Sequence, residues 1–170
     1  MAAIEVYTPT GVVAGETAGV ALTNEGPDLG SPLTVDESAW YPLDGGPPSQ
    51  RGRVRIAPDD MLLVVTGEED MPVHMNWYPI TLDVGPYRVS AQIGTLPGFD
   101  PERALARPGH TYIPLRDATI ELVRRGDVAP ARRAHVHVNR YAVETVATSL
   151  MLGFFFPGAT FTKQEAVPVA

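Results

Sequence analysis

The chain has no cysteine and only one lysine, Lys163, among its 170 residues. Without cysteine it can form no disulfide, no thiolate metal site and no thiol nucleophile. No apolar run approaches the roughly 20 residues that a membrane-spanning helix needs. The N-terminus also lacks the basic start and apolar stretch of a signal peptide. We therefore expect a soluble, cytoplasmic protein that makes no membrane contact.

Positive charge is missing from the first fifty residues, which carry seven acidic residues and neither Lys nor Arg. The other thirteen acidic residues balance all thirteen basic ones, so the net charge of −7 arises within residues 1–50. Residues 124–140 are locally basic, with five arginines and one aspartate. These arginines are not interleaved with aromatic residues that could stack on bases, so nucleic-acid binding is not expected. The two patches are either simply solvated or meet between copies of the chain.

Gly (16) and Pro (17) are abundant, which disfavours long helices because Pro lacks a backbone donor and Gly is costly within a helix. Apolar residues alternate with polar ones instead, as at Ile80, Leu82 and Val84, and this period is typical of strands. One short helix is predicted near 100–107, where Asp100 can act as the N-cap and proline follows it.

Two parts of the chain have similar amino-acid sequences. The segment AWYPLDGG resembles part of HTYIPLRDATIELV when Pro42 is placed on Pro114, a shift of 72 positions. Further on, Val54 falls on Val136 with a shift of 82, so the turns between the matching strands differ in length. The similarity indicates an internal duplication with a unit of roughly seventy residues. The alternative is two unrelated strands that happen to share a Pro-Leu pair.

We predict an all-β fold with two related small halves, at 5–78 and 79–150, followed by an aromatic strand and tail at 151–170. Each half would be a curved sheet or β-barrel, and packing the halves together would cover the edges of their short strands. A single β-sandwich that contains all the strands is the alternative fold.

The second half contains a recognisable pattern: an aromatic residue, an apolar residue, Pro-Leu, any residue, Asp-Ala, and about twenty residues later a strand ending Val-Asn-Arg. The matching residues here are Tyr112, Ile113, Pro114, Leu115, Asp117, Ala118, Val138, Asn139 and Arg140. In this pattern, residues 80–147 resemble small uncharacterised bacterial domains. The resemblance implies a small all-β domain and no particular biochemistry. The first half departs from it, since Gly45-Gly46 stands in place of Asp-Ala.

Asp117, Asn139 and Arg140 are the candidate ligand-binding residues within this pattern. They also have a structural interpretation. Asn139 can cap a turn with its side chain, and Arg140 can pair with Asp117 on a neighbouring strand.

His135 and His137 are the candidate metal ligands. Two residues apart in a strand, they project from the same face, and a third ligand such as His74, His110 or Asp117 would complete a site for a divalent ion. The alternative is that both histidines lie on the solvated face of a half-buried sheet. We predict no bound cofactor.

The run Phe154, Phe155 and Phe156 cannot point inward as a whole, because successive side chains in a strand alternate between faces. Either both faces are covered or aromatic surface is offered to a partner. Together with Arg132 and Arg133 on the basic segment, these residues form the predicted subunit interface.

The chain contains neither a nucleophile elbow nor a phosphate-binding glycine motif, so no enzymatic activity is predicted. We predict a non-catalytic assembly or binding module that acts through protein–protein contacts and self-associates into a homo-oligomer. The alternative is a small-molecule- or metal-binding protein, or an enzyme, that uses the strand face of His135 and His137.

Overall fold

A computed structural model describes most of the chain. The described residues are 2–18, 22–23, 26–27, 32–67, 76–95, 111–150, 152 and 155–163. They form strands and turns, with one short 3-10 helix, which confirms the predicted all-β class. The helix expected near 100–107 lies outside the described residues. No helix in the described ranges is long and apolar enough to span a membrane.

The strands of residues 2–66 come first. They are β1 (Ala2–Tyr7), β2 (Gly11–Thr17), β3 (Leu22–Thr23), β4 (Gly26–Pro27), β5 (Leu33–Pro42), β6 (Ser49–Ile56) and β7 (Leu63–Thr66), with the 3-10 helix η1 (Pro58–Asp60) before β7. The second part contains β8 (Asn76–Val84), β9 (Tyr87–Thr95), β10 (Tyr112–Leu122), β11 (Ala131–Asn139), β12 (Val143–Thr148) and β13 (Thr160–Lys163).

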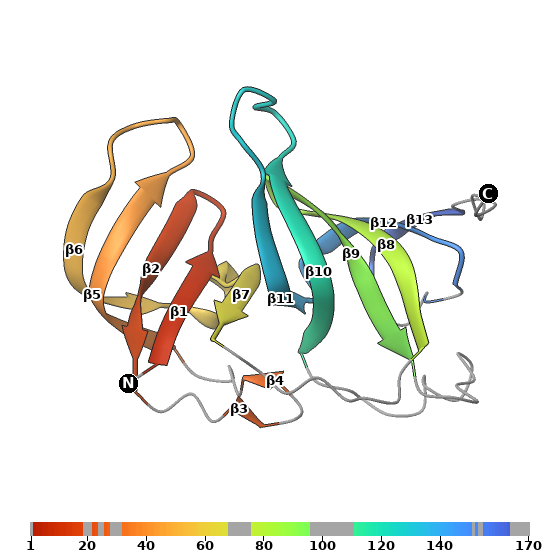
Figure 1. Cartoon of the computed structure of the whole chain (residues 1–170), viewed down its shortest axis with the longest axis horizontal. Coiled ribbons are helices and arrows are strands. Elements are labelled where there is room, and N and C mark those ends of the chain that lie inside the picture. The colour runs from red at the N-terminus through yellow and green to blue at the C-terminus, as the bar shows by residue number, and fades with distance from the viewer. Residues whose placement is uncertain are drawn as a thin grey trace.

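Eleven of these strands form one open sheet, in the order β13-β12-β8-β9-β10-β11-β7-β1-β2-β5-β6, while β3 and β4 pair with each other (Figure 1). Neighbouring strands are antiparallel except β12 and β13. A β-sandwich would instead consist of two separate stacked sheets. Strands β6 and β13 are the two ends of the sheet, so among the described strands each has one edge without a neighbour.

The sheet contains two runs of the same form. Residues 2–66 contribute the run β7-β1-β2-β5-β6, and residues 76–148 contribute β12-β8-β9-β10-β11. In the first run, β1, β2, β5 and β6 are neighbours in that order, and β7 pairs with the other edge of β1. In the second run, β8, β9, β10 and β11 are neighbours in that order, and β12 pairs with the other edge of β8. The runs join where β11 pairs with β7, with His137 opposite Val64 and Val138 opposite Leu63.

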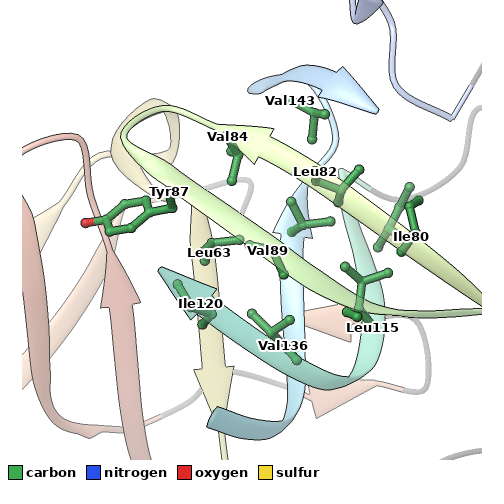
Figure 2. Packing of buried hydrophobic residues seen from close by; sticks show 14 of the residues in the cluster. Leu63, Ile80, Leu82, Val84, Tyr87, Val89, Leu115, Ile120, Val136 and Val143 are labelled. Atoms are coloured by element: carbon green, nitrogen blue, oxygen red, sulfur yellow. The ribbon is translucent and has the colours of Figure 1, made fainter. Parts of the chain in front are cut away.

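Two hydrophobic clusters make up the interior. The larger, here called the C-terminal core, is built mainly from β8 to β12 (Figure 2). The smaller N-terminal core is built mainly from β1, β2, β5, β6 and β7. Strand β7 serves both, since Leu63 belongs to the C-terminal core and the next residue, Val64, to the N-terminal core. This follows from the alternation of side chains between the faces of a strand.

Aromatic side chains cross between the two parts. Tyr7 joins the C-terminal core, and Tyr112 joins the N-terminal core. The ring of Tyr87 meets that of Tyr7 edge to face, with centroids 5.3 Å apart, and its hydroxyl donates to the backbone oxygen of Thr8 at 2.7 Å. Edge-to-face pairs contribute about 0.5–1.5 kcal/mol beyond burial. These side-chain contacts between the two runs add to the strand pairing of β11 with β7.

Candidate functional site

The two histidines predicted to bind metal lie on β11, close to the junction with β7. The register places His135 opposite Arg116, and His137 opposite both Pro114 and Val64. The expectation of a solvated face is wrong for His137, which is 2% exposed, because β7 packs beside it. No group of three or more metal-ligating side chains is found in the part of the chain that the structure describes. His74 and His110 lie outside that part.

Asp117 lies at an irregularity in β10, where the pairing with β9 shifts between Arg116 and Thr119. Its backbone has a φ of 51°, and its exposed carboxylate is 3.7 Å from the Nε of Arg116. The predicted pairing with Arg140 is wrong, because Arg140 follows the far end of β11. There its backbone N–H donates to the oxygen of Thr111 and its Nη2 donates to the hydroxyl of Tyr141.

Asn139 holds the end of β11 against the segment before β7. Its backbone N–H donates to the oxygen of Leu62 at 2.9 Å, and its Nδ2 donates to the oxygen of Met61 at 3.3 Å. Its Oδ1 accepts from the backbone N–H of Tyr141 at 3.1 Å, which confirms that the side chain caps a turn. Both polar atoms of the buried Asn139 amide are therefore hydrogen-bonded to the backbone of the chain itself.

The predicted interface arginines differ in their surroundings. Arg133 donates from Nε and Nη2 to the two carboxylate oxygens of Glu5, at 2.7 and 2.8 Å. This hydrogen-bonded pair raises the pKa of Arg133 above its usual value. Part of the charge complementarity expected between copies is thus used within one chain, while Arg132 is exposed.

Two residues of the phenylalanine run can be placed. Phe156 is completely buried in the C-terminal core, and Phe155 is half-buried against it. The prediction that Phe156 forms a subunit interface is wrong, because the side chain has no exposed surface to offer a partner. Phe154 lies outside the described residues.

A groove of about 500 Å³ on the first run was not expected from the sequence. Val13, Val54 and Ile56 line its apolar part, and all three belong to or pack against the N-terminal core. Trp40, which is half-buried, and the exposed Arg51 also line it. The groove therefore combines an apolar surface and an aromatic ring with the exposed charged residues Arg51, Arg55 and Asp60, beside β6, the end strand of the sheet.

Arg51 has no carboxylate partner among the described residues. Its Nε donates to the hydroxyl of Ser49 at 3.1 Å, and its guanidinium carbon is 6.0 Å from the centre of the Trp40 ring. Two residues away, Arg53 forms an ion pair with Asp36 at 2.6 Å. Arginines at every second position immediately after the acidic first fifty residues were the signal in the sequence.

A smaller groove of about 240 Å³ lies between the two runs. It is mainly apolar, and its lining includes Tyr87, Leu43 and Leu122 together with the more exposed Tyr41 and Val128. It lies between the hairpins β5–β6 and β10–β11.

No family model, curated protein or solved structure matches this chain. Its function is therefore inferred from the geometry of the chain itself.

Proposed function

We propose that the chain is a non-catalytic assembly module, built from two related halves, that associates with further copies of itself. The two halves are the runs β7-β1-β2-β5-β6 and β12-β8-β9-β10-β11, called here the N-terminal half and the C-terminal half. The observation that carries the proposal is the edge of β6 that has no neighbour among the described strands. Its counterpart in the C-terminal half, β11, is joined to a further strand.

An unusual backbone feature supports the relation between the halves. Glu37 in β5 and Asp117 in β10 are the non-glycine residues with positive φ in the described ranges, at 49° and 51°. Such residues are uncommon in proteins. Glu37 lies where the pairing register of β5 with β2 shifts, and Asp117 lies where the register of β10 with β9 shifts. The third strand of each half thus carries the same irregularity.

Burial along the same strands agrees with this alignment. Starting from Leu33 in β5 and Ile113 in β10, nine of ten successive positions are alike in being buried, half-buried or exposed. In this alignment Pro42 corresponds to Leu122. The alignment based on the amino-acid sequence placed Pro42 on Pro114, which is eight positions earlier.

The turns after the fourth strands correspond as well. The N–H of Asp60 donates to the oxygen of Ala57 at 3.0 Å, and the N–H of Ala142 donates to that of Asn139 at 3.1 Å. The donor Asp60 corresponds to Ala142 and the acceptor Ala57 to Asn139, each with a shift of 82 positions. The same shift places Val54 on Val136. A common plan for the two halves explains these correspondences.

The junction within the chain suggests how copies would meet. A strand edge exposes backbone N–H and C=O groups that can pair with a further strand. In the C-terminal half this edge, on β11, is paired with β7 of the N-terminal half. The equivalent edge of β6 lacks a neighbour in the part of the chain that the structure describes, and a strand from a second copy would pair there. Because β6 and β13 are different ends of one sheet, such contacts would be head to tail.

Light scattering across protein concentrations tests this proposal. A mass above the 18.3 kDa of one chain, rising with concentration, is expected. Arg55→Glu changes an exposed charge on β6 and should weaken association several-fold at low salt and less at high salt. The matched control is Arg124→Glu, an exposed arginine on the β10–β11 hairpin. A mass of one chain at high micromolar concentration and low salt would refute self-association.

The resemblance of residues 80–147 to uncharacterised bacterial all-β domains implies no particular biochemistry and stays a prediction. The domain limits at 5–78 and 79–150 and the cytoplasmic location also stay predictions. Nucleic acid is not proposed as a partner.

A further inference from the structure

We propose that the groove beside Trp40 is a binding site for a small aromatic carboxylate, whose ring enters the apolar part of the groove while its carboxylate binds Arg51. The site goes beyond the proposed association of copies, because Val54 and Ile56 line the groove with the face of β6 that belongs to the N-terminal core, not with the edge of the strand. The groove volume of about 500 Å³ lies within the range of about 300–1,000 Å³ that is typical of small-molecule sites.

The equivalent apolar surface of the C-terminal half is covered by the chain itself. The shift of 82 that relates the fourth strands places Val54 on Val136 and Ile56 on Val138. Val136 and Val138 are completely buried. Val54 is half-buried, and both Val54 and Ile56 line the open groove. Among the described residues, the N-terminal half thus leaves open an apolar surface that its counterpart buries.

Two side chains of the C-terminal core have no counterpart here among the described residues. The first is the ring of Tyr87, which starts β9 and is completely buried (Figure 2). The residue that starts β2 is Gly11, which has no side chain. The second is Leu63, which β7 supplies from beyond β11, whereas no described strand lies beyond β6. A ring and an aliphatic group are therefore the kinds of group that this part of the fold accepts.

Trp40 gives the groove an aromatic wall. A Cβ on Gly11 would come within 2.6 Å of the Trp40 ring, so the glycine allows the ring to lie against the backbone of β2. The tryptophan is half-buried and lines the groove. Aromatic rings favour edge-to-face or offset-stacked contacts with one another. The wall therefore favours a ligand whose apolar part is a ring.

The charges of the groove favour an anion. Arg51, Arg55 and Asp60 line it and are exposed, so two positive charges stand against one negative charge. The Nε of Arg51 donates to the hydroxyl of Ser49, and no carboxylate contacts this guanidinium in the described residues. A guanidinium binds a carboxylate through parallel, charge-assisted hydrogen bonds. A single carboxylate on the ligand would supply the partner that Arg51 lacks.

Isothermal titration calorimetry with three compounds that share one ring system tests the site. Naphthylacetate is an anion, naphthylacetamide is neutral, and naphthylmethylamine is a cation at neutral pH. The protein should bind the anion with a Kd of about 0.1–1 mM, as expected for a ligand of this size. The amide should bind about tenfold more weakly, because a hydrogen bond between charged groups is lost. The amine should bind more weakly still.

Variants place the binding in the groove. Arg51→Gln should weaken binding of naphthylacetate about tenfold and leave that of naphthylacetamide unchanged. Arg124→Gln, the matched control, changes an exposed arginine outside the groove and should affect neither compound. Arg51→Glu should reverse the preference in favour of the amine, a result that general damage to the fold would not produce. Val54→Phe should fill the groove and prevent binding of all three compounds while thermal unfolding stays cooperative.

Equal affinities for naphthylacetate and naphthylacetamide, or equal effects of Arg51→Gln and Arg124→Gln, would overturn the inference. Tighter binding of octanoate than of naphthylacetate would overturn the choice of an aromatic ligand. The titration is made on dilute protein and does not require self-association. Selective binding by a chain that scatters as a single molecule would therefore support this site while refuting the proposed function.

Discussion

Arg133 on β11 and Glu5 on β1 are 128 positions apart in the chain and form a two-point ion pair with N–O distances of 2.7 and 2.8 Å. The pair connects the second half of the sheet to the first beside the β11–β7 junction. Both side chains are about one-third exposed, so part of their interaction is screened by water.

Removing one member of this pair should destabilise the fold. Glu5→Gln and Arg133→Gln should each lower the free energy of unfolding by about 1–2 kcal/mol, because hydrogen bonds between charged groups are lost in a partly shielded place. Urea unfolding of both single variants and the double variant checks this. A coupling energy near zero between the two positions would show that the pair contributes nothing to stability.

The hydroxyl of Tyr87 should contribute to holding the halves together. Tyr87→Phe keeps the ring contact with Tyr7 but removes the 2.7 Å hydrogen bond to the oxygen of Thr8. The expected loss is about 1 kcal/mol. Tyr41→Phe is the control, since Tyr41 is exposed and no hydrogen bond is found for its hydroxyl in the described residues. Equal stability of the two variants in urea would argue against this contribution.

Stability should fall in alkaline solution. Burial, reinforced by the negative charge of Glu5 and opposed by Arg133, raises the pKa of Tyr7 to about 12. In the unfolded chain the phenol ionises near its usual pKa of about 10. The stability that Tyr7 contributes through its raised pKa is therefore fully present below pH 10, and it is lost as the pH rises from 10 towards 12.

The pKa values of Tyr87 and Tyr112 are also raised, by burial in the first place, so they should add to the alkaline loss. Urea midpoints measured between pH 8 and 11.5 should fall less steeply for Tyr7→Phe, which has no proton to lose. Parallel curves for Tyr7→Phe and the parent would contradict the assignment.

Asn139→Ala should be costly, because the buried side chain bonds to both Met61 and Tyr141. Leaving these backbone groups without the amide should cost about 2 kcal/mol. Asn139→Asp keeps an acceptor for the N–H of Tyr141 but cannot donate to Met61 when ionised, so an intermediate stability is expected at neutral pH. Stability equal to that of the parent for Asn139→Ala would show that the turn does not depend on the amide.

Local pattern was enough to predict several features. The alternation of Ile80, Leu82 and Val84 predicted a strand with one buried face, and all three belong to the C-terminal core. Asn139 was predicted to cap a turn, because an Asn side chain can reach the backbone two residues further on. Each of these features depends on residues that are close in the sequence, and a period of two survives folding whatever strand lies alongside.

Features that depend on distant partners required the tertiary structure. His137 was expected on a solvated face, yet it is buried because β7, more than sixty residues earlier, is the neighbour of β11. The spelling of the sequence placed Pro42 on Pro114, whereas burial and backbone geometry align Glu37 with Asp117.

The sequence by itself determined that the chain forms strands and which side chains of a strand face inward, since both follow from local alternation and from the abundance of Gly and Pro. The tertiary structure decided which edge is paired, which arginine receives a carboxylate and where a groove stays open. Those outcomes depend on how β11 and β7 meet and on whether a site such as Gly11 is filled by a side chain, and neither is a property of any short stretch of sequence.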